Sequence, residues 1–399
     1  MRPEVKLTLY ILAISLVLAI AAFIIKQNTT KGDFLSPFSQ DLNIFSFFGN
    51  KEKPKKIIYG YLPFWSLDEI EYLQLNKLTD IAYFGLNINE DGSFQKTGEP
   101  GYNHWINNKE LHKLIKKANA RGIRFAVTVI SQDDEISDKF LDCRECWTTL
   151  SRNLKSEMNK NGVKHVNLNF EYSGDTPKDK AIKYAEFVDF INREMDKTYG
   201  DSFTVTAAFA DSSTKPRVTS ELDTLGKVAD AVFIMAYDFH RTESEHAGPV
   251  APINDSEFDL KDMLKDYLSV ISPNKLIMGV PYYGYNWVVY SDDMRAERRE
   301  GNDEIGYSQS QIYSKVIDDI TTLKPQIKWD AQAQEPYFHY VSPETNSLRE
   351  VYFENEKSLK AKYELAKENK LAGIGIWALG YDGGYTNLWK LLYEEFIKN

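Results

Sequence analysis

The sequence predicts an α/β protein whose main domain is a closed TIM (β/α)8 barrel, and three observations support this. Short apolar runs rich in β-forming residues recur along the chain, amphipathic helical stretches separate them, and the runs are apolar almost throughout, as in strands buried on both faces. The expected strands are residues 57–62, 80–86, 123–129, 163–170, 203–209, 230–237, 275–282 and 373–379. These are eight strands, the number that a TIM barrel contains. A doubly wound open sheet is the alternative.

The amino-terminal segment is expected to hold the protein at a membrane. Residues 7–25 contain no charged side chain, and a membrane-spanning helix needs about 20 apolar residues. A secretory signal has a shorter apolar core, of about 7–15 residues. We therefore predict a transmembrane anchor over residues 1–26, with a cleaved signal and a secreted protein as the alternative. Residues 27–54, irregular and containing Gly, Pro and Ser, are predicted to be a linker to a domain at 55–399.

Helices are expected between the strands, and two of them have clear ends. Lys109–Arg121 is amphipathic and is followed by Gly122, and Ile182–Tyr199 is followed by Gly200. Glycine directly after a helical run is a typical stop signal, because it adopts the left-handed conformation that ends many helices.

The interval between the last two strands is too long for one helix and predicts an insertion at about 288–353. It contains a charged helical stretch, Ser308–Leu323, and two alternating runs, Ile327–Val341 and Ser347–Phe353. We expect a small α+β subdomain on the barrel rim. Active sites of such barrels lie at the carboxyl ends of the strands, so the subdomain would form one wall of a cleft.

Composition and charge exclude several function classes. The formal net charge of -10 argues against a nucleic-acid partner, which requires a concentrated basic surface. Aromatic residues make up 13% of the chain, a mild indication of carbohydrate contact. His240 and His246 have no recognised metal-ligand spacing and are interpreted as part of a polar loop. We expect neither a metal nor a cofactor.

The two cysteines, Cys143 and Cys146, form a C-x-x-C motif in the expected loop after the third strand. Two cysteines are too few for a disulfide framework or for a four-cysteine zinc site. A redox motif would need a thioredoxin-like context, which is absent from the pattern. A local disulfide in an exported protein is therefore favoured.

Polar residues at three strand ends carry the candidate chemistry. Side chains alternate along a strand, so Asn167, Asn169 and Glu171 should share one face of the fourth strand. That face must be the barrel interior, where polar groups need bonds to each other or to a ligand. The residues alone leave both possibilities open. The sixth strand supplies Met235, Tyr237 and Asp238 and the eighth Trp377, again at carboxyl ends.

These motifs resemble those of glycoside hydrolase family 18, the chitinase-like barrels. The family's strand-four signature, D-x-x-D-x-D-x-E, corresponds to Lys164, Asn167, Asn169 and Glu171, and its M-x-Y-D motif corresponds to Met235, Tyr237 and Asp238. The resemblance covers roughly residues 57–395. The run 278–287, with Tyr282 and Trp287, and the segments 329–340 and 352–380 resemble bacterial members related to spore-cortex-lytic enzymes.

The resemblance implies hydrolysis of β-linked N-acetylglucosamine glycans, such as chitin or peptidoglycan, by substrate-assisted retaining catalysis. Glu171 would be the proton donor, Tyr237 and Asp238 would bind the acetamide, and Trp377 would form the floor beneath the sugar. The resemblance also places Asn167, Met235, Tyr282 and Trp287 among the substrate-binding residues. Asn169 stands where the family usually has Asp, although a related family of endo-acting N-acetylglucosaminidases uses Asn at that place. No cofactor is implied.

Two other functions remain open from the sequence. The first is a family-18-like barrel that binds glycans and cleaves them weakly or not at all. The second is a conventional retaining hydrolase with Asp238 as nucleophile, which would require about 5–5.5 Å between the two carboxyl groups. For each of these functions we expect the barrel to lie on the extracytoplasmic side of a membrane contacted through residues 7–25, or to be secreted if that segment is cleaved.

Overall fold

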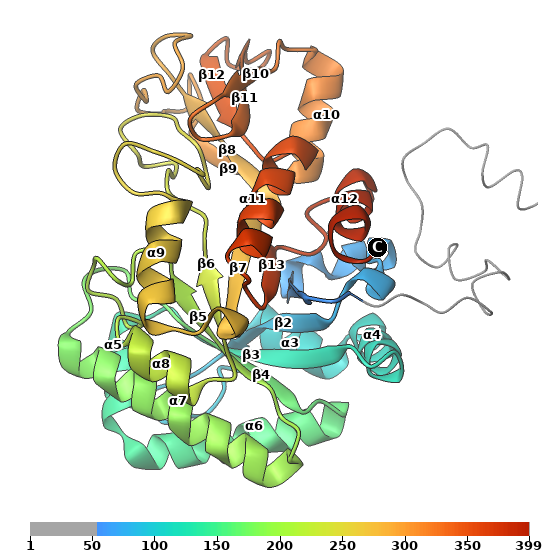
Figure 1. The fold of residues 1–399 in the computed structure, drawn as a ribbon, viewed down its shortest axis with the longest axis vertical. Coiled ribbons are helices and arrows are strands. Elements are labelled where there is room, and N and C mark those ends of the chain that lie inside the picture. Colours follow the sequence, from blue (N-terminus) through green and yellow to red (C-terminus); the bar gives the residue numbers. More distant parts are fainter. Residues whose placement is uncertain (1–53, 399) are drawn as a thin grey trace, which may run out of the picture.

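The computed structural model of the protein describes residues 54–398, which form a barrel with an additional sheet above one end (Figure 1). The barrel closes in the order β1-β13-β7-β6-β5-β4-β3-β2, and every neighbouring pair is parallel. Its strands are β1 (Ile57–Pro63), β2 (Asp80–Asn87), β3 (Arg124–Ser131), β4 (His165–Phe170), β5 (Thr204–Phe209), β6 (Ala231–Met235), β7 (Leu276–Pro281) and β13 (Gly373–Trp377). Each expected run overlaps one of these strands, and β1, β2 and β3 extend one or two residues beyond their runs. The predicted barrel is confirmed, and the open sheet is excluded.

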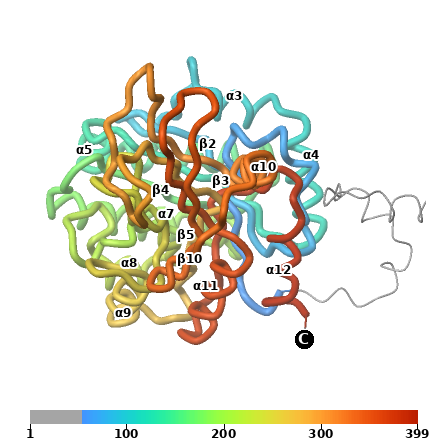
Figure 2. Tube along the Cα trace, turned by 90° about the horizontal axis from the view of Figure 1, so that it is seen from above, coloured from blue at the N-terminus to red at the C-terminus, as the bar shows by residue number. Residues whose placement is uncertain are grey.

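Helices surround the strands, as the view from above shows (Figure 2). They are α3 (Pro100–Asn107), α4 (Lys109–Ala120), α5 (Asp134–Asp142), α6 (Arg144–Asn161), α7 (Lys178–Tyr199), α8 (Leu222–Val228), α9 (Leu260–Val270), α11 (Glu356–Glu368) and α12 (Asn387–Phe396). The Asn108 side chain caps α4 by accepting from the Leu111 amide at 2.9 Å. Gly200, with φ 74°, ends α7 in the left-handed conformation, as the sequence predicts.

Aromatic rings fill the inside of the barrel. The Phe233 ring on β6 lies 4.8 Å from the Tyr61 ring and 5.7 Å from the Tyr59 ring, both on β1, between ring centroids. It also crosses to β13, where a Cβ on Gly375 would come within 1.9 Å of the Phe233 ring. Glycine is therefore needed at 375 so that the large ring can fit, and the barrel is a packed core rather than a channel.

The chain between β7 and β13 forms a second sheet with the antiparallel order β10-β11-β12-β8-β9. Its elements are β8 (Tyr283–Val288), β9 (Gln309–Ile312), α10 (Tyr313–Leu323), β10 (Lys328–Asp330), β11 (Glu335–Val341) and β12 (Leu348–Tyr352). The sheet begins at Tyr283, earlier than the expected boundary at 288. Residues 308–323 contain a strand before their helix, and 327–341 contain two strands, because the chain turns between Asp330 and Glu335.

The expected anchor at 7–25 lies outside the described residues, as does the linker apart from Pro54. No helix within residues 54–398 is both long enough and apolar enough to cross a bilayer.

Candidate active site

Strand β4 carries the candidate acid, Glu171, directly after its last residue. Phe170 points outward, where its ring packs 5.1 Å from Tyr184 and 5.5 Å from Phe187 of α7. Asn169 is 3% exposed and lies on the opposite face. Alternation along β4 therefore directs Asn169 and Glu171 to the inner side of the barrel, as the sequence predicts.

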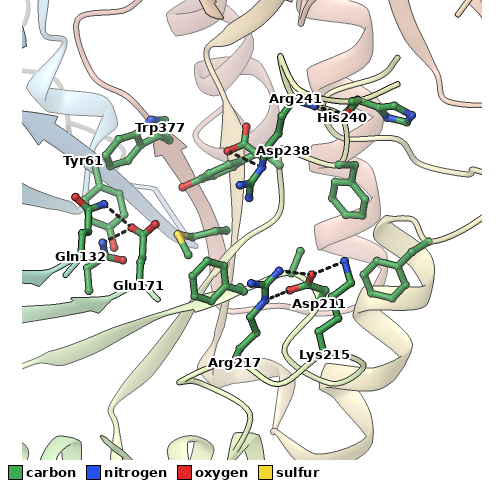
Figure 3. Close-up of a pocket in the computed structure, with 18 of the residues that line it drawn as sticks. Tyr61, Gln132, Glu171, Asp211, Lys215, Arg217, Asp238, His240, Arg241 and Trp377 are labelled. Carbon is green, nitrogen blue, oxygen red and sulfur yellow. Dashed lines mark hydrogen bonds and ion pairs between the residues drawn. The ribbon is translucent and has the colours of Figure 1, made fainter. Parts of the chain in front are cut away.

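The Glu171 carboxylate accepts two amide hydrogen bonds at the same oxygen, Oε1 (Figure 3). Asn169 Nδ2 donates to it at 2.6 Å, and Gln132 Nε2 donates at 3.2 Å. Glu171 itself is partly exposed. A carboxyl group that is fixed in orientation and open to a cleft can donate or accept a proton.

The segment after β6 supplies the second part of the site. Asp238 has φ 64°, an uncommon value for a residue other than glycine, and this conformation turns the chain directly after Tyr237. The Asp238 Oδ1 atom accepts hydrogen bonds from the hydroxyl groups of Tyr283 and Tyr285, the latter at 2.8 Å. Burial, with smaller contributions from neighbouring acidic groups including Asp238 and Glu171, raises the pKa of Tyr237 well above its usual value. Tyr237 therefore remains a neutral hydroxyl donor at physiological pH.

An aromatic cluster faces these polar groups. The Trp377 ring, at the end of β13, lies 5.0 Å from Phe84, 5.4 Å from Tyr61 and 6.4 Å from Trp65. Trp65 is 50% exposed, and its Nε1 donates to the Tyr381 hydroxyl at 3.1 Å. Apolar ring surfaces of this kind suit the faces of sugar rings.

The acid, the segment after β6 and the aromatic cluster meet at one cavity of about 880 Å³, which Tyr283, Tyr285 and Tyr381 support from behind its lining. The expected residues that reach it are Asn169, Glu171, Met235, Tyr237, Asp238 and Trp377. The volume lies within the range usual for ligand sites, about 300–1,000 Å³.

Three residues expected to bind substrate do not line this cavity. Asn167 is 0% exposed and lies deeper in the barrel, where its Nδ2 donates to the Val205 carbonyl at 3.4 Å. Tyr282 is also 0% exposed and bonds the Tyr363 hydroxyl at 3.3 Å. Trp287 is 0% exposed within the inserted sheet, where its Nε1 donates to the Arg241 carbonyl at 2.9 Å. Burial by the core or by the inserted sheet keeps all three from the cavity.

The sequence interpretation missed several lining residues. Trp65 follows β1 and Gln132 follows β3, so both stand at carboxyl ends of barrel strands, and position alone could have identified them. The loop after β6 adds Arg241, whose Nε lies 3.9 Å from Asp238 Oδ2.

A charged cluster forms the wall beside β5 (Figure 3). The Arg217 guanidinium donates to both oxygens of Asp211, at 2.9 and 2.8 Å, and Lys215 Nζ lies 3.2 Å from Asp211 Oδ2. Burial alone would raise the pKa of Asp211, but Arg217 and Lys215 hold it below its usual value. The carboxylate therefore stays ionised across the neutral range.

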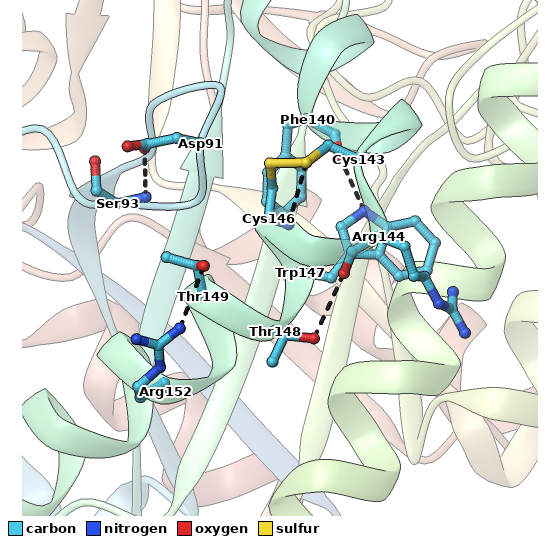
Figure 4. The surroundings of a disulfide bond; sticks show 10 residues. All are labelled: Asp91, Ser93, Phe140, Cys143, Arg144, Cys146, Trp147, Thr148, Thr149 and Arg152. Carbon is cyan, nitrogen blue, oxygen red and sulfur yellow. Dashed lines mark hydrogen bonds between the residues drawn. A yellow bond between two sulfur atoms is a disulfide. The ribbon is translucent and has the colours of Figure 1, made fainter.

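Cys143 and Cys146 form a disulfide (Figure 4). They do not lie in an open loop after β3, because Cys143 separates α5 from α6 and caps α6, its Sγ accepting from the Cys146 amide at 3.2 Å. His240 bonds the Pro249 carbonyl through Nδ1 at 2.9 Å. Within residues 54–398 no group of three or more His, Cys, Asp or Glu residues is arranged to hold a metal ion.

Solved structures with the same fold include enzymes of two kinds. The spore cortex-lytic enzyme SleL of Bacillus megaterium QM B1551 matches with a TM-score of 0.69 at 21% identity, over 87% of this chain and 75% of that one. A GH18 chitinase from Cycas revoluta in complex with (GlcNAc)3 matches with a TM-score of 0.71 at 19% identity, over 85% and 99%.

Sequence relatives have similar descriptions. The putative sporulation-specific glycosylase YdhD of Bacillus subtilis is 26% identical over 259 residues, which are 61% of this chain and 54% of that protein. The cortical fragment-lytic enzyme of Bacillus anthracis is 25% identical over 333 residues, covering 80% and 68%. Human di-N-acetylchitobiase is 25% identical over 307 residues, covering 72% and 77%. The chain thus spans about half of YdhD.

The family model described as glycosyl hydrolases family 18 matches residues 57–382. That range begins at the first residue of β1 and extends beyond β13, so it contains the whole barrel and the inserted sheet. The chain belongs to glycosyl hydrolases family 18.

Proposed function

We propose that the protein is a glycosidase that hydrolyses β-linked N-acetylglucosamine glycans, of the chitin or peptidoglycan type, by substrate-assisted retaining catalysis. The observation that carries the proposal is the placement of Glu171, Tyr237, Asp238 and Trp377 around one cavity of about 880 Å³. Family membership supports it, because family 18 is among the glycosidases whose substrate supplies its own nucleophile.

In this mechanism the acetamido oxygen of the sugar attacks the anomeric carbon, and the bond to the leaving oxygen breaks. Glu171 gives its proton to the leaving oxygen. It then takes a proton from the incoming water, whose oxygen bonds the anomeric carbon while the bond to the acetamido oxygen breaks. Tyr237 donates a hydrogen bond to the acetamide oxygen, and Asp238 accepts from the acetamide N–H. Trp377 packs against the face of the sugar. No cofactor takes part in these steps.

The position of Asp238 favours this mechanism over a conventional one with Asp238 as nucleophile. Its Oδ1 already accepts from two tyrosine hydroxyls, on Tyr283 and Tyr285. Hydrogen bonds to a carboxylate stabilise its charge and lower its nucleophilicity, so this arrangement suits an acceptor for the acetamide better than an attacking group.

The relatives support a substrate with N-acetylglucosamine. The Bacillus anthracis relative is a cortical fragment-lytic enzyme, the human relative is a di-N-acetylchitobiase, and the Cycas revoluta chitinase holds (GlcNAc)3. Peptidoglycan and chitin-type oligosaccharides are therefore the substrates to test first.

The test is to incubate the protein with chitooligosaccharides and with peptidoglycan, and to analyse the products by mass spectrometry. The Glu171→Gln variant should keep the fold and lose hydrolysis, because an amide cannot donate and recover the proton. Glu186→Gln, at an exposed position on α7, is the matched control and should be fully active. Turnover near that of wild type in Glu171→Gln would refute the assignment.

A second candidate function is glycan binding with little or no cleavage, and Asn169 favours it. Asn169 is neutral, so it cannot offset the positive charge that develops on the sugar, and a preorganised group of this kind contributes about 2.7–4 kcal/mol. If the enzyme is attenuated, Asn169→Asp should raise kcat by up to about 10²–10³. If the site functions with Asn, the new charge should move the pH optimum upward without a gain in rate. If the barrel only binds glycans, affinity alone should change.

We also propose that residues 7–25 anchor the protein in a membrane with the barrel on the extracytoplasmic side. The disulfide between Cys143 and Cys146 supports this location, because disulfides persist in oxidising compartments. Protease treatment of intact cells should remove the barrel domain. Full protection of the domain from the protease would show that the orientation is the opposite of the one proposed. Release of the protein into the medium would favour a cleaved signal.

A further inference from the structure

We propose that Gln132 is a positioning residue for Glu171: with Asn169 it binds one carboxylate oxygen, and the other oxygen then carries the proton that is transferred. This proposal rests on the function proposed above for Glu171.

The strand register brings the two residues together. β3 and β4 are neighbouring parallel strands, paired at Ile130 with Asn169 and at Ser131 with Phe170. Gln132 and Glu171 are the residues that directly follow these two strands, and the Glu171 amide donates to the Ser131 carbonyl at 2.9 Å. Gln132 is thus held level with Glu171 by the backbone of the barrel.

The two amides contact the same atom. Gln132 Nε2 lies 3.2 Å and Asn169 Nδ2 lies 2.6 Å from Glu171 Oε1 (Figure 3). An ionised carboxylate only accepts hydrogen bonds, so each amide must turn its NH₂ end toward it. Oε1 therefore receives two N–H groups from two strands.

This geometry determines where the proton of the neutral acid can lie. A proton on Oε1 would face two N–H groups, which are themselves donors, whereas Oε2 receives a hydrogen bond from neither amide. The neutral acid of Glu171 therefore carries its proton on Oε2. When that proton leaves, both amides stabilise the carboxylate that forms.

The hydrogen bond from Gln132 is especially important in this chain because residue 169 is Asn. An aspartate there could share a proton with Glu171, whereas Asn169 offers a fixed donor on one side only. The second donor, from β3, fixes the carboxylate between two strands. Gln132 is itself exposed, so its removal leaves the barrel core unchanged.

The kinetic test compares Gln132→Ala and Gln132→Glu with wild type, on the N-acetylated substrate that wild type cleaves. Gln309→Ala, on β9 of the inserted sheet and exposed, is the control. In Gln132→Ala we expect kcat to fall about tenfold, the lower end of what a hydrogen bond to a charged group contributes, with KM nearly unchanged. The alkaline limb of the pH–rate profile should move upward, and further upward in Gln132→Glu because of the added like charge.

A second readout does not depend on turnover. The Glu171 carboxyl carbon can be followed by ¹³C NMR, its signal identified by loss in Glu171→Gln. Its titration midpoint should rise in Gln132→Ala and rise further in Gln132→Glu. An unchanged midpoint in Gln132→Ala would overturn the proposal, since the added charge of Gln132→Glu shifts the midpoint with or without the hydrogen bond. A higher KM at unchanged kcat would also overturn it, because it would mean that Gln132 contacts the sugar instead. If wild type cleaves no glycan, the proposed function fails, and the titration still decides the role of Gln132.

Discussion

Lys362 should be one of the most sensitive positions for stability, because it is a buried cation between two buried carboxylates. Its Nζ lies 3.2 Å from Glu335 Oε1 and 2.8 Å from Glu354 Oε1, and all three side chains are 0% exposed. Glu335 also accepts the backbone amides of Val250 and Ala251, at 2.8 and 2.7 Å. The cluster therefore joins the inserted sheet and α11 to the loop after β6 that lines the cavity.

Lys362→Met fills the space but leaves Glu335 and Glu354 without their cation. Breaking a buried ion pair by removing one partner costs about 3–5 kcal/mol. At about 2 °C per kcal/mol for a large domain, Tm should fall by roughly 6–10 °C. The assay is thermal and urea unfolding at pH 7. The double variant Lys362→Met/Glu354→Gln should recover part of the loss, because burial already raises the pKa of Glu354 to about 8 and a neutral amide beside Glu335 needs no cation.

The matched control is Lys360→Met on the same helix. Lys360 is half exposed and pairs with Glu364 and Glu395, so solvent screens its ion pairs and its removal should lower Tm far less than Lys362→Met does. Equal losses for Lys360→Met and Lys362→Met would refute the claim that the buried cluster stabilises the junction.

Three further predictions concern stability. Burial raises the pKa of Asp382 from its ordinary 3.8 to about 7. Stability should therefore be highest below about pH 4, fall as the pH rises from about 4 to about 7, and change no further with this group above that. Asp382→Asn should flatten the plot of Tm against pH between about 4 and 7, and an unaltered slope there would count against it. Changing Cys143 and Cys146 to serine should cost about 2 kcal/mol in urea unfolding. Alanine at both positions should cost about 1 kcal/mol more, since serine still caps α6; equal losses would argue against the cap. Gly375→Ala should lower stability by about 1–3 kcal/mol through overpacking against Phe233, and an unchanged Tm would contradict that packing.

The barrel could be predicted from sequence because strands buried on both faces are apolar throughout and are separated by helices. The same apolar character made the boundary between the barrel and the inserted sheet impossible to predict. The run 278–287 is apolar or aromatic apart from Asn286, but the chain leaves β7 at Pro281 and enters β8 at Tyr283. Tyr282 and Trp287 therefore pack into the core and the inserted sheet, and a period of two does not tell which sheet a strand joins.

The candidate site was predictable where a motif and a strand end coincide, as at Glu171 and Asp238. Gln132 and Trp65 were not predicted because neither belongs to a motif. Gln132 nevertheless directly follows β3, and Trp65 lies two residues after β1. Their roles depend on neighbours distant in sequence: Glu171 for Gln132, and Trp377 and Tyr381 for Trp65. Such pairs require the strand order, which a single sequence does not specify.

The most direct test of the central claim compares one oligosaccharide in its N-acetylated and its de-N-acetylated form, matched in length and linkage. If the acetamide is the nucleophile and Glu171 the acid, wild type should cleave the N-acetylated form with retention of configuration and leave the free amine form intact. Cleavage of both forms at similar rates would contradict substrate assistance.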